Sequence, residues 1–336
     1  MTPPMPESPH ARYRDKVDPR PAGEDTPFWS VMIPSYNCGD YLRLTLASVL
    51  AQDPGADKMQ IEVVDDCSED GDPAGIVADF GHGRVGYLRQ PRNVGHIANF
   101  HTCIQRARGR VVHILHGDDL VEPGFYAALE DGFLSDPLIG AAFCRATYID
   151  ADGREMGRTE VEAETAGPMA NGLARLAREQ RIMTPSIAVR REVYRELGGF
   201  DRRLKCSEDW EMWVRIAAFH PIWYEPRPLA KYRMHQNSNT GRHLRSAGDM
   251  AYTRRAIEIF ADYLTPQMRR TVVPQARRAY ARSSLDMARN MLRLGEKRAA
   301  WAQVWQAVRF DASPEVLLSA AKIVARSIGS IGAANS

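Results

Sequence analysis

Apolar residues in the first 120 positions follow two different spacings, which predicts alternating strands and helices. Short apolar runs predict strands over residues 31–33, 61–64, 85–90 and 111–115. Apolar residues three or four positions apart predict helices over residues 42–50, 76–80 and 97–107. This alternation is typical of an α/β fold with a mostly parallel sheet and right-handed crossovers, in which ligands bind beyond the carboxyl ends of the strands.

The second half of the chain is less regular, but it also contains predicted elements. Strands or extended segments are expected over residues 141–148 and 185–189, and near Ile222 and Leu229. Helices are expected over residues 173–181 and after the loop 198–207, with Glu208 and Asp209 in the first turn. From residue 251 the pattern is helical, and a 3.6-residue apolar spacing over 316–328 predicts an amphipathic helix.

Charge is unevenly distributed along the chain. Residues 251–336 hold 14 Lys and Arg against 6 Asp and Glu, a net charge of +8, whereas the whole chain carries only +2. A basic helical tail fits either a solvated surface or an anionic partner such as a phospholipid membrane. The amphipathic helix likewise fits docking on the main domain or lying on a membrane surface. The sequence leaves both pairs of alternatives open.

The leader and the cysteines indicate the cellular setting. The first 27 residues hold seven prolines and no apolar cluster, so a disordered leader is expected and not a signal peptide. No segment reaches the roughly 18 apolar residues of a membrane span. The five cysteines are widely spaced without a CxxC pair, which favours reduced thiols. A cytoplasmic protein is expected, at most peripheral to the inner face of the membrane.

Two predicted strands end in paired aspartates. The strand over 61–64 runs into Asp65 and Asp66, and the strand over 111–115 leads through His116 into Asp118 and Asp119. Adjacent carboxylates repel each other and lose solvation at a strand end, so a cation or a hydrogen-bond donor is needed to offset that cost. The pattern predicts a polyanion held through a metal ion.

A glycine motif lies between these two pairs. Gly81, Gly83 and Gly86 spell GxGxxG. A dinucleotide site needs this motif directly after a strand and at the start of a helix, whereas here it precedes the strand over 85–90. A turn is therefore expected at these glycines.

Seven short motifs follow one another between residues 29 and 240. They are IPSYN at 33–37, VVDDCS at 63–68, NVG at 93–95, HGDD at 116–119, GGFD at 198–201, SEDW at 207–210, and YRMH at 232–235 with Ser238. In this order and spacing they resemble the family 2 glycosyltransferases of GT-A fold. The resemblance implies one α/β domain over 28–245, with a nucleotide-binding half over 28–120, an acceptor half over 121–245, and a basic helical extension over 246–336.

The resemblance assigns the nucleotide to the first half. The residues implied are Pro34, Ser35, Tyr36, Asp65, Asp66, Asn93, Gly95, His116 and Asp118. Residues 34–36 depart from the strand, so their backbone and the Tyr36 ring are free to contact a nucleobase. The alternative is a plain turn that ends the strand. Asp66 can accept the imino N–H of uracil or thymine. Asp65 lies beside it, and the alternative for this pair is that one carboxylate caps a turn through Ser68.

A divalent cation is implied at the second pair of aspartates. Asp118 and Asp119 occupy the place of the family's Asp-any-Asp signature, whose hard oxygen ligands suit Mg²⁺ or Mn²⁺ bridging a diphosphate. His235, in the family's Tyr-Arg-any-His segment, is the further ligand implied. His116 departs from the pattern, because the family usually has an acidic residue there. It fits either a nucleotide contact or a packed histidine.

The acceptor half supplies the implied catalytic groups. Asp209 is the general base implied for the acceptor hydroxyl and Glu208 supports it, with helix capping as the alternative. The residues implied at the acceptor or the diphosphate are Gly199, Phe200, Trp210 and Arg233. Trp210 also fits the apolar core.

The resulting hypothesis is an inverting, metal-dependent glycosyltransferase that uses a UDP or dTDP sugar. Its acceptor would be a glycan or a lipid-linked intermediate in polysaccharide or glycolipid synthesis, and no nucleic-acid partner is expected. One alternative is a non-catalytic nucleotide-sugar-binding protein, which His116 suggests. The other is a sugar nucleotidyltransferase, which typically has a glycine-rich loop with basic residues where this chain has residues 34–37.

Overall fold

The computed structural model describes residues 8–19, 26–235 and 248–332. The chain divides into two compact units. The first comprises residues 1–172, 181–203 and 208–234, and the second comprises residues 173–180, 204–207 and 235–336. Ser238 of the last motif lies outside the described residues.

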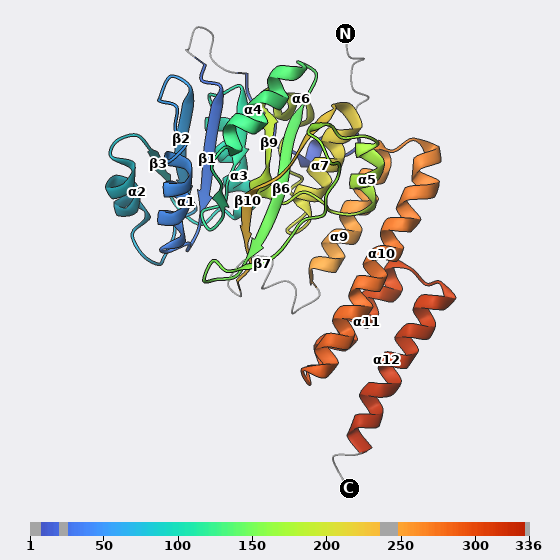
Figure 1. The fold of residues 1–336 in the computed structure, drawn as a ribbon. Helices are drawn as coiled ribbons and strands as arrows, with labels where there is room; N and C mark the ends of the chain where they lie inside the picture. Colours follow the sequence, from blue (N-terminus) through green and yellow to red (C-terminus); the bar gives the residue numbers. More distant parts are fainter. Residues whose placement is uncertain (1–7, 20–25, 236–247, 333–336) are drawn as a thin grey trace. The chain divides into compact units, whose positions relative to one another are not determined.

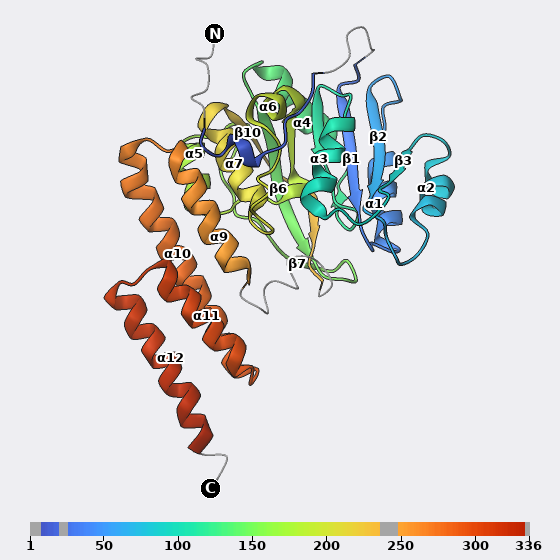
Figure 2. The same ribbon diagram turned by 180° about the vertical axis from the view of Figure 1, so that it is seen from behind.

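Four parallel strands form one half of the sheet in the first unit. They run in the order β3 (Gly86–Arg89), β2 (Met59–Asp65), β1 (Trp29–Ser35) and β4 (Val111–Ile114). Every residue of β1 and β2 is buried, as expected for parallel strands covered on both faces. Figures 1 and 2 show α1 (Tyr41–Leu50) and α3 (His96–Arg106) on opposite faces of these strands.

The other half of the sheet mixes strand directions. The antiparallel β9 (Ile187–Arg190) joins β4 to β6 (Ala141–Ile149), which pairs in parallel with β10 (Ile222–Arg233). The short β5 (Leu120–Val121) pairs with β10, as does β8 (Gly167–Pro168), and β7 (Glu155–Arg158) pairs with β6. The predicted α/β fold with a mostly parallel sheet flanked by helices is confirmed.

Several elements differ from those predicted. The strands expected near Ile222 and Leu229 form one strand, β10, whose register with β6 shifts between Glu225 and Ala230. Pro226 and Pro228 lack the N–H groups that a regular ladder needs, which explains the irregularity. Two helices, α4 (Phe125–Ser135) and α6 (Arg191–Leu197), occupy segments where no element was expected. The GxGxxG glycines lie between the end of α2 (Pro73–Gly81) and β3, so the predicted turn is confirmed.

The leader is more ordered than its prolines suggested. Residues 8–19 contain a 3₁₀ turn, η1 (Ala11–Tyr13), and Arg14 pairs with Asp201 in an isolated antiparallel bridge. The N–H of Gly199 donates to the carbonyl of Asp15 at 2.9 Å. The expectation of disorder over residues 1–27 is therefore wrong for 8–19, because backbone pairing and burial of Val17 fix this segment.

Helices α1, α2 and α4 pack on the sheet around a continuous apolar core in the first unit. Its large members include Trp29, Ile33, Leu46, Val63, Phe125 and Phe133. Helix α7 (Glu208–Phe219) begins with Glu208 and Asp209, as predicted, and buries Trp210 and Trp213. The core therefore fixes the strand ends, and the two buried tryptophans anchor the start of α7.

The second unit is helical. It holds α9 (Gly248–Phe260), α10 (Pro266–Arg293), α11 (Lys297–Phe310) and α12 (Pro314–Gly332), with most of α5 (Gly172–Arg178). Figure 2 shows α10, α11 and α12 side by side. Val316, Ala320 and Ile323 of α12 are buried, so its apolar face is covered. Among the described helices, none has the length and apolar character needed to cross a bilayer.

Candidate active site

Three loops meet at the carboxyl ends of β1, β2 and β4. The N–H of Asp66 donates to Ser35 O at 2.8 Å, and the N–H of Gly117 donates to Pro34 O at 3.0 Å. A Cβ at Gly117 would lie 3.0 Å from Cys38 Sγ, so glycine permits this close approach. The structure thus brings together three segments that the sequence predicted to share one edge of the sheet.

Asp65 is bound within its own loop. Its carboxylate accepts the Ser68 N–H at 3.2 Å and the Ser68 hydroxyl at 2.5 Å. Arg89 Nη1 donates to the same carboxylate at 2.8 Å, and the Tyr87 hydroxyl donates to it at 3.2 Å. Ser68 Oγ also accepts the N–H of Asn37 at 2.9 Å. The capping alternative is therefore realised, and a nucleotide contact by Asp65 stays a prediction.

Asp66 is hydrogen-bonded to the loop that precedes α3. Its two carboxylate oxygens accept the N–H groups of Val94 at 2.7 Å and Gly95 at 3.0 Å. Burial raises the pKa of Asp66, and these two hydrogen bonds oppose that shift. Tyr36 and Asn93 are exposed on the two loops that Asp66 joins. These side chains, with the Asp66 carboxylate, are the predicted nucleoside contacts.

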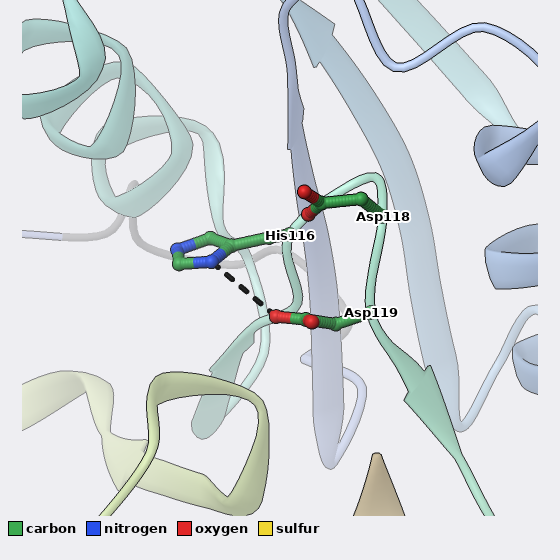
Figure 3. Close-up of side chains that lie close together, drawn as sticks. All are labelled: His116, Asp118 and Asp119. Atoms are coloured by element: carbon green, nitrogen blue, oxygen red, sulfur yellow. Dashed lines mark ion pairs between the residues drawn. The ribbon is translucent and has the colours of Figure 1, made fainter. Parts of the chain in front are cut away.

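His116, Asp118 and Asp119 form a compact cluster after β4. One ligand atom from each lies within 4.8 Å of the others. Figure 3 shows the three side chains directed to the same side of the loop, with His116 Nδ1 3.4 Å from Asp119 Oδ2. The His116 ring also stacks on Phe100 at 5.2 Å, with the planes 12° apart. His116 is thus packed, and it also belongs to the candidate metal site.

The cluster fits a divalent cation. Asp119 Oδ2 and His116 Nε2 are buried without a hydrogen-bond partner among the residues that the structure describes. Burial raises the pKa of Asp119 to about 6, although the interaction with His116 at 3.4 Å opposes this shift. A buried carboxylate of this kind is stabilised by a nearby positive charge. Two carboxylates and an imidazole are suitable donors for Mn²⁺ or Mg²⁺.

Arg233 holds in place the loop of residues 116–119, here termed the candidate metal loop. Its backbone N–H donates to Asp119 Oδ1 at 2.8 Å, and its side-chain Nε donates to the carbonyl of Asp118 at 2.8 Å. Nη1 donates to the carbonyls of Asp150 and Ala151, and the guanidinium lies 4.4 Å from the centre of the Tyr41 ring. The side chain is buried. Arg233 therefore positions the loop, and its contact with a diphosphate stays a prediction.

Asp209 stands at the first turn of α7, half-buried. Its Oδ2 accepts the Thr184 hydroxyl at 3.3 Å, and its Oδ1 accepts the Trp210 N–H at 2.7 Å. Burial, followed by the charge of Glu208, raises the pKa of Asp209 to about 7. His96 Nε2 lies 3.2 Å from Glu208 Oε1. A carboxylate with a pKa near neutrality is suited to accept a proton in catalysis.

Aromatic contacts join the candidate metal loop to the acceptor half. Phe100 lies 5.6 Å from His96, 5.2 Å from His116 and 5.4 Å from Phe200, between ring centres. Phe200 in turn contacts Trp213 of α7 at 6.2 Å. Phe200 and Trp210 are both buried, which matches the core alternative given for Trp210. Their contact with an acceptor stays a prediction, as does that of Gly199.

His96 and Thr184 contact candidate site residues, and the sequence did not predict them. His96 directly follows the NVG motif, and its ring faces Glu208 across the fold. Thr184 precedes Pro185 in a 3₁₀ turn, and no local pattern marks it as a partner of Asp209. His235 belongs to the second unit, whereas the cluster at 116–119 belongs to the first. Its role as a metal ligand stays a prediction.

Comparisons with known proteins agree with the motifs. The model of the family described as "Glycosyl transferase family 2" matches residues 30–198, half of the chain. An uncharacterized protein of Mycobacterium tuberculosis is 29% identical over 219 residues, which are 62% of this chain and 67% of that protein. The succinoglycan biosynthesis protein ExoO of Rhizobium meliloti is 35% identical over 103 residues, 31% of this chain and 29% of ExoO.

Solved structures show the same fold. S. aureus TarS in complex with UDP-GlcNAc superposes with a TM-score of 0.58 at 14% identity, covering 85% of this chain and 92% of that one. The mannosyltransferase PcManGT from Pyrobaculum calidifontis, in complex with GDP-Man and Mn²⁺, gives a TM-score of 0.57 at 20% identity, covering 93% and 83%. Because the match covers only 29% of ExoO and 67% of the M. tuberculosis protein, the substrates of these relatives do not transfer directly.

Proposed function

The chain belongs to glycosyl transferase family 2 and is a glycosyltransferase, and we propose that it transfers one sugar from a nucleotide-diphosphate sugar to an acceptor hydroxyl with inversion. The observation that carries the proposal is that the His116–Asp119 cluster and Asp209 lie close enough for the charge of His116 to lower the pKa of Asp209. Ring contacts through Phe100 and Phe200 connect His116 with Trp213 of α7, the helix that carries Asp209. A cation site and a base with a raised pKa are the two groups that this reaction needs.

The donor nucleotide belongs at the ends of β1 and β2 in this proposal. The exposed Tyr36 ring offers a stacking surface, and Asp66 offers a carboxylate for the imino N–H of uracil or thymine. Asp66 already accepts two backbone N–H groups, but its carboxylate oxygens have further lone pairs. UDP and dTDP sugars are therefore the favoured donors. TarS, with UDP-GlcNAc, has the same fold.

His116, Asp118 and Asp119 are the residues that would hold the cation, with His235 as a further candidate. A bound Mn²⁺ or Mg²⁺ supplies Lewis-acid stabilisation of the departing diphosphate. Arg233 keeps the two aspartates in place through the hydrogen bonds to Asp119 Oδ1 and Asp118 O. A site held in this way is preorganised, so little free energy is needed to rearrange it during the reaction.

Asp209 acts as the general base. Its carboxylate takes the proton of the acceptor hydroxyl while the acceptor oxygen forms a bond to the anomeric carbon. The bond from that carbon to the diphosphate oxygen breaks, and the nucleoside diphosphate leaves with the electron pair. Thr184 and the Trp210 N–H orient the carboxylate through hydrogen bonds. A single in-line displacement of this kind inverts the anomeric configuration.

The acceptor is proposed to be a glycan or a lipid-linked glycan intermediate. Support comes from the name of ExoO, a relative that takes part in succinoglycan biosynthesis, and from the net charge of +8 over residues 251–336. Such a tail favours an anionic membrane surface, where lipid-linked acceptors reside. We place the enzyme in the cytoplasm, peripheral to the inner face of the membrane.

A thermal-shift screen tests the donor site. UDP, dTDP and GDP sugars are each added with and without Mn²⁺, because a ligand that binds only the folded state raises the melting temperature. The proposal predicts a metal-dependent rise with a uracil or thymine nucleotide. A rise with the GDP sugars alone would contradict the assignment of Asp66. No rise with any nucleotide sugar, metal present, would contradict the donor site as a whole.

A further inference from the structure

We propose that the exposed face of α11 binds the surface of an anionic lipid bilayer. This face, here termed the α11 stripe, consists of Arg298, Trp301, Trp305 and Arg309. Their spacing of three, four and four residues places all four on one side of the helix. The stripe spans about 16 Å at the rise of an α-helix.

The two tryptophans carry most of the exposed apolar surface of the stripe. Trp301 is 49% exposed and Trp305 is 62% exposed, although most tryptophans are largely buried. The Trp301 indole N–H donates to Ser327 Oγ at 3.1 Å, which fixes the ring against α12. Leu317 and Leu318 add further exposed apolar side chains on α12. Adjacent exposed aromatic side chains of this size mark a contact surface.

Charge and ring chemistry favour a lipid surface as the occupant. Tryptophan prefers the headgroup region of a bilayer, where its ring is apolar and its N–H meets polar groups. Arg298 and Arg309 are exposed at the two ends of the stripe, where guanidinium groups reach phosphates. The Arg309 guanidinium lies 6.0 Å from the Trp305 ring centre. Positive ends around an apolar centre complement an anionic interface.

The two acidic residues that follow α11 most closely do not cancel this positive charge. Glu315 pairs with Arg282 at 3.0 Å, and Asp311 pairs with Arg278 at 3.3 Å. Both acids are therefore compensated by bases of α10. The helices from residue 251 onward keep their net charge of +8, and a surface of one sign attracts anionic lipid over about a Debye length.

A second copy of the chain fits the stripe less well. Two copies related by a twofold axis, with the helices antiparallel, would place Arg298 of one beside Arg309 of the other. Like charges in such contact oppose association.

Helix α12, which the sequence suggested as a membrane contact, has Val316, Ala320 and Ile323 of its apolar face buried, so these side chains are not available to a membrane. The α11 stripe takes that role in this proposal.

Sedimentation of the full-length protein with vesicles tests the proposal. The vesicles contain phosphatidylcholine alone or with phosphatidylglycerol, at low ionic strength. We expect binding to the anionic vesicles only. R298Q/R309Q should weaken it by about 30-fold, from about fivefold per arginine, and W305S should weaken it by about tenfold. Trp305 is 62% exposed, so W305S should leave the fold intact.

Matched variants keep the test specific. L134S/L138S removes two exposed apolar side chains elsewhere, and R270Q/R293Q removes the same charge from α10. L134S/L138S should bind vesicles like the wild type, and R270Q/R293Q should weaken binding much less than R298Q/R309Q does. Equal binding by W305S and wild type would overturn the proposal, as would a dimer in solution that W305S dissociates without any vesicle binding. Nucleotide-sugar thermal shifts on the same variants should not change, so this failure is separable from failure of the proposed function.

Discussion

The two carboxylate oxygens of Asp119 have different surroundings. Oδ1 accepts the N–H of Arg233 at 2.8 Å, whereas Oδ2 faces His116 Nδ1 at 3.4 Å and is buried without a hydrogen-bond partner among the described residues. An amide at this position keeps an oxygen for the Arg233 N–H but removes the negative charge. The structural and the metal-binding roles can therefore be separated.

Asp119→Asn should weaken Mn²⁺ binding while leaving the fold intact. We expect at least about a tenfold loss of affinity, because a carboxylate ligand is replaced by a neutral amide. Isothermal titration with Mn²⁺ in the presence of UDP measures the effect. Asp40→Asn, the same change at an exposed aspartate before α1, should bind Mn²⁺ like the wild type. Unchanged affinity in Asp119→Asn would remove Asp119 from the metal site.

The raised pKa of Asp209 predicts the pH dependence of the reaction. A general base must be deprotonated, so kcat/KM should fall as the pH drops through about 7. The Thr184 hydroxyl stabilises the ionised carboxylate and lowers its pKa. Thr184→Val should therefore move the acidic limb to higher pH, while kcat at pH 9 changes by less than about threefold. A limb at the same pH in both proteins would show that another group controls it.

Residue chemistry predicted part of the site. The aspartate pairs and the Glu208–Asp209 pair were recognisable because each follows an apolar run or starts a helix. Asp66 and Asp119, however, form hydrogen bonds to residues 28 and 114 positions away. The partners Thr184 and His96 have no local signal, because they reach the site only through long-range packing.

At the scale of elements, the N-terminal segment and α7 hold the Gly198–Gly199 loop between them. The buried Glu211 of α7 accepts from Arg215 at 2.9 Å and lies 3.6 Å from Arg14. Arg215 also donates to the carbonyls of Leu197, Gly198 and Gly199. Because α7 carries Asp209, this cluster links the leader to the base.

Arg14→Met should destabilise the first unit. Removing Arg14 leaves the buried Glu211 paired with Arg215, so the variant loses one buried charge-assisted contact, and we expect the free energy of unfolding to fall by about 2 kcal/mol. Calorimetry of the full chain should show this as a lower melting temperature. Arg12→Gln alters the neighbouring exposed arginine and should have little effect. Equal melting temperatures for the two variants would mean that residues 8–19 do not brace the loop.

Element prediction succeeded where the pattern was local. The strands and helices of the first 120 residues were found because apolar spacing there is regular. Helix α6 has only seven residues, fewer than a window for periodicity needs, and it was missed. Order in the segment 8–19 depends on pairing with Asp201 and Gly199, nearly 190 positions away, so composition alone pointed to disorder.

At the scale of the whole molecule, the account requires that a cation accompany the donor. Treatment with EDTA should abolish transfer, and added Mn²⁺ or Mg²⁺ should restore it, because the departing diphosphate needs Lewis-acid stabilisation. The assay measures release of nucleoside diphosphate in the presence of acceptor. Full activity after chelation would contradict a metal-dependent reaction.

In the proposed mechanism, Asp209 removes the acceptor proton in a reaction at the His116–Asp119 site. The most direct test of this step is turnover by Asp209→Asn, with nucleotide binding measured on the same sample. The account predicts that kcat falls by about 10²- to 10⁴-fold, while the Mn²⁺-dependent thermal shift with the donor nucleotide stays as in the wild type. Turnover at the wild-type rate would contradict the account.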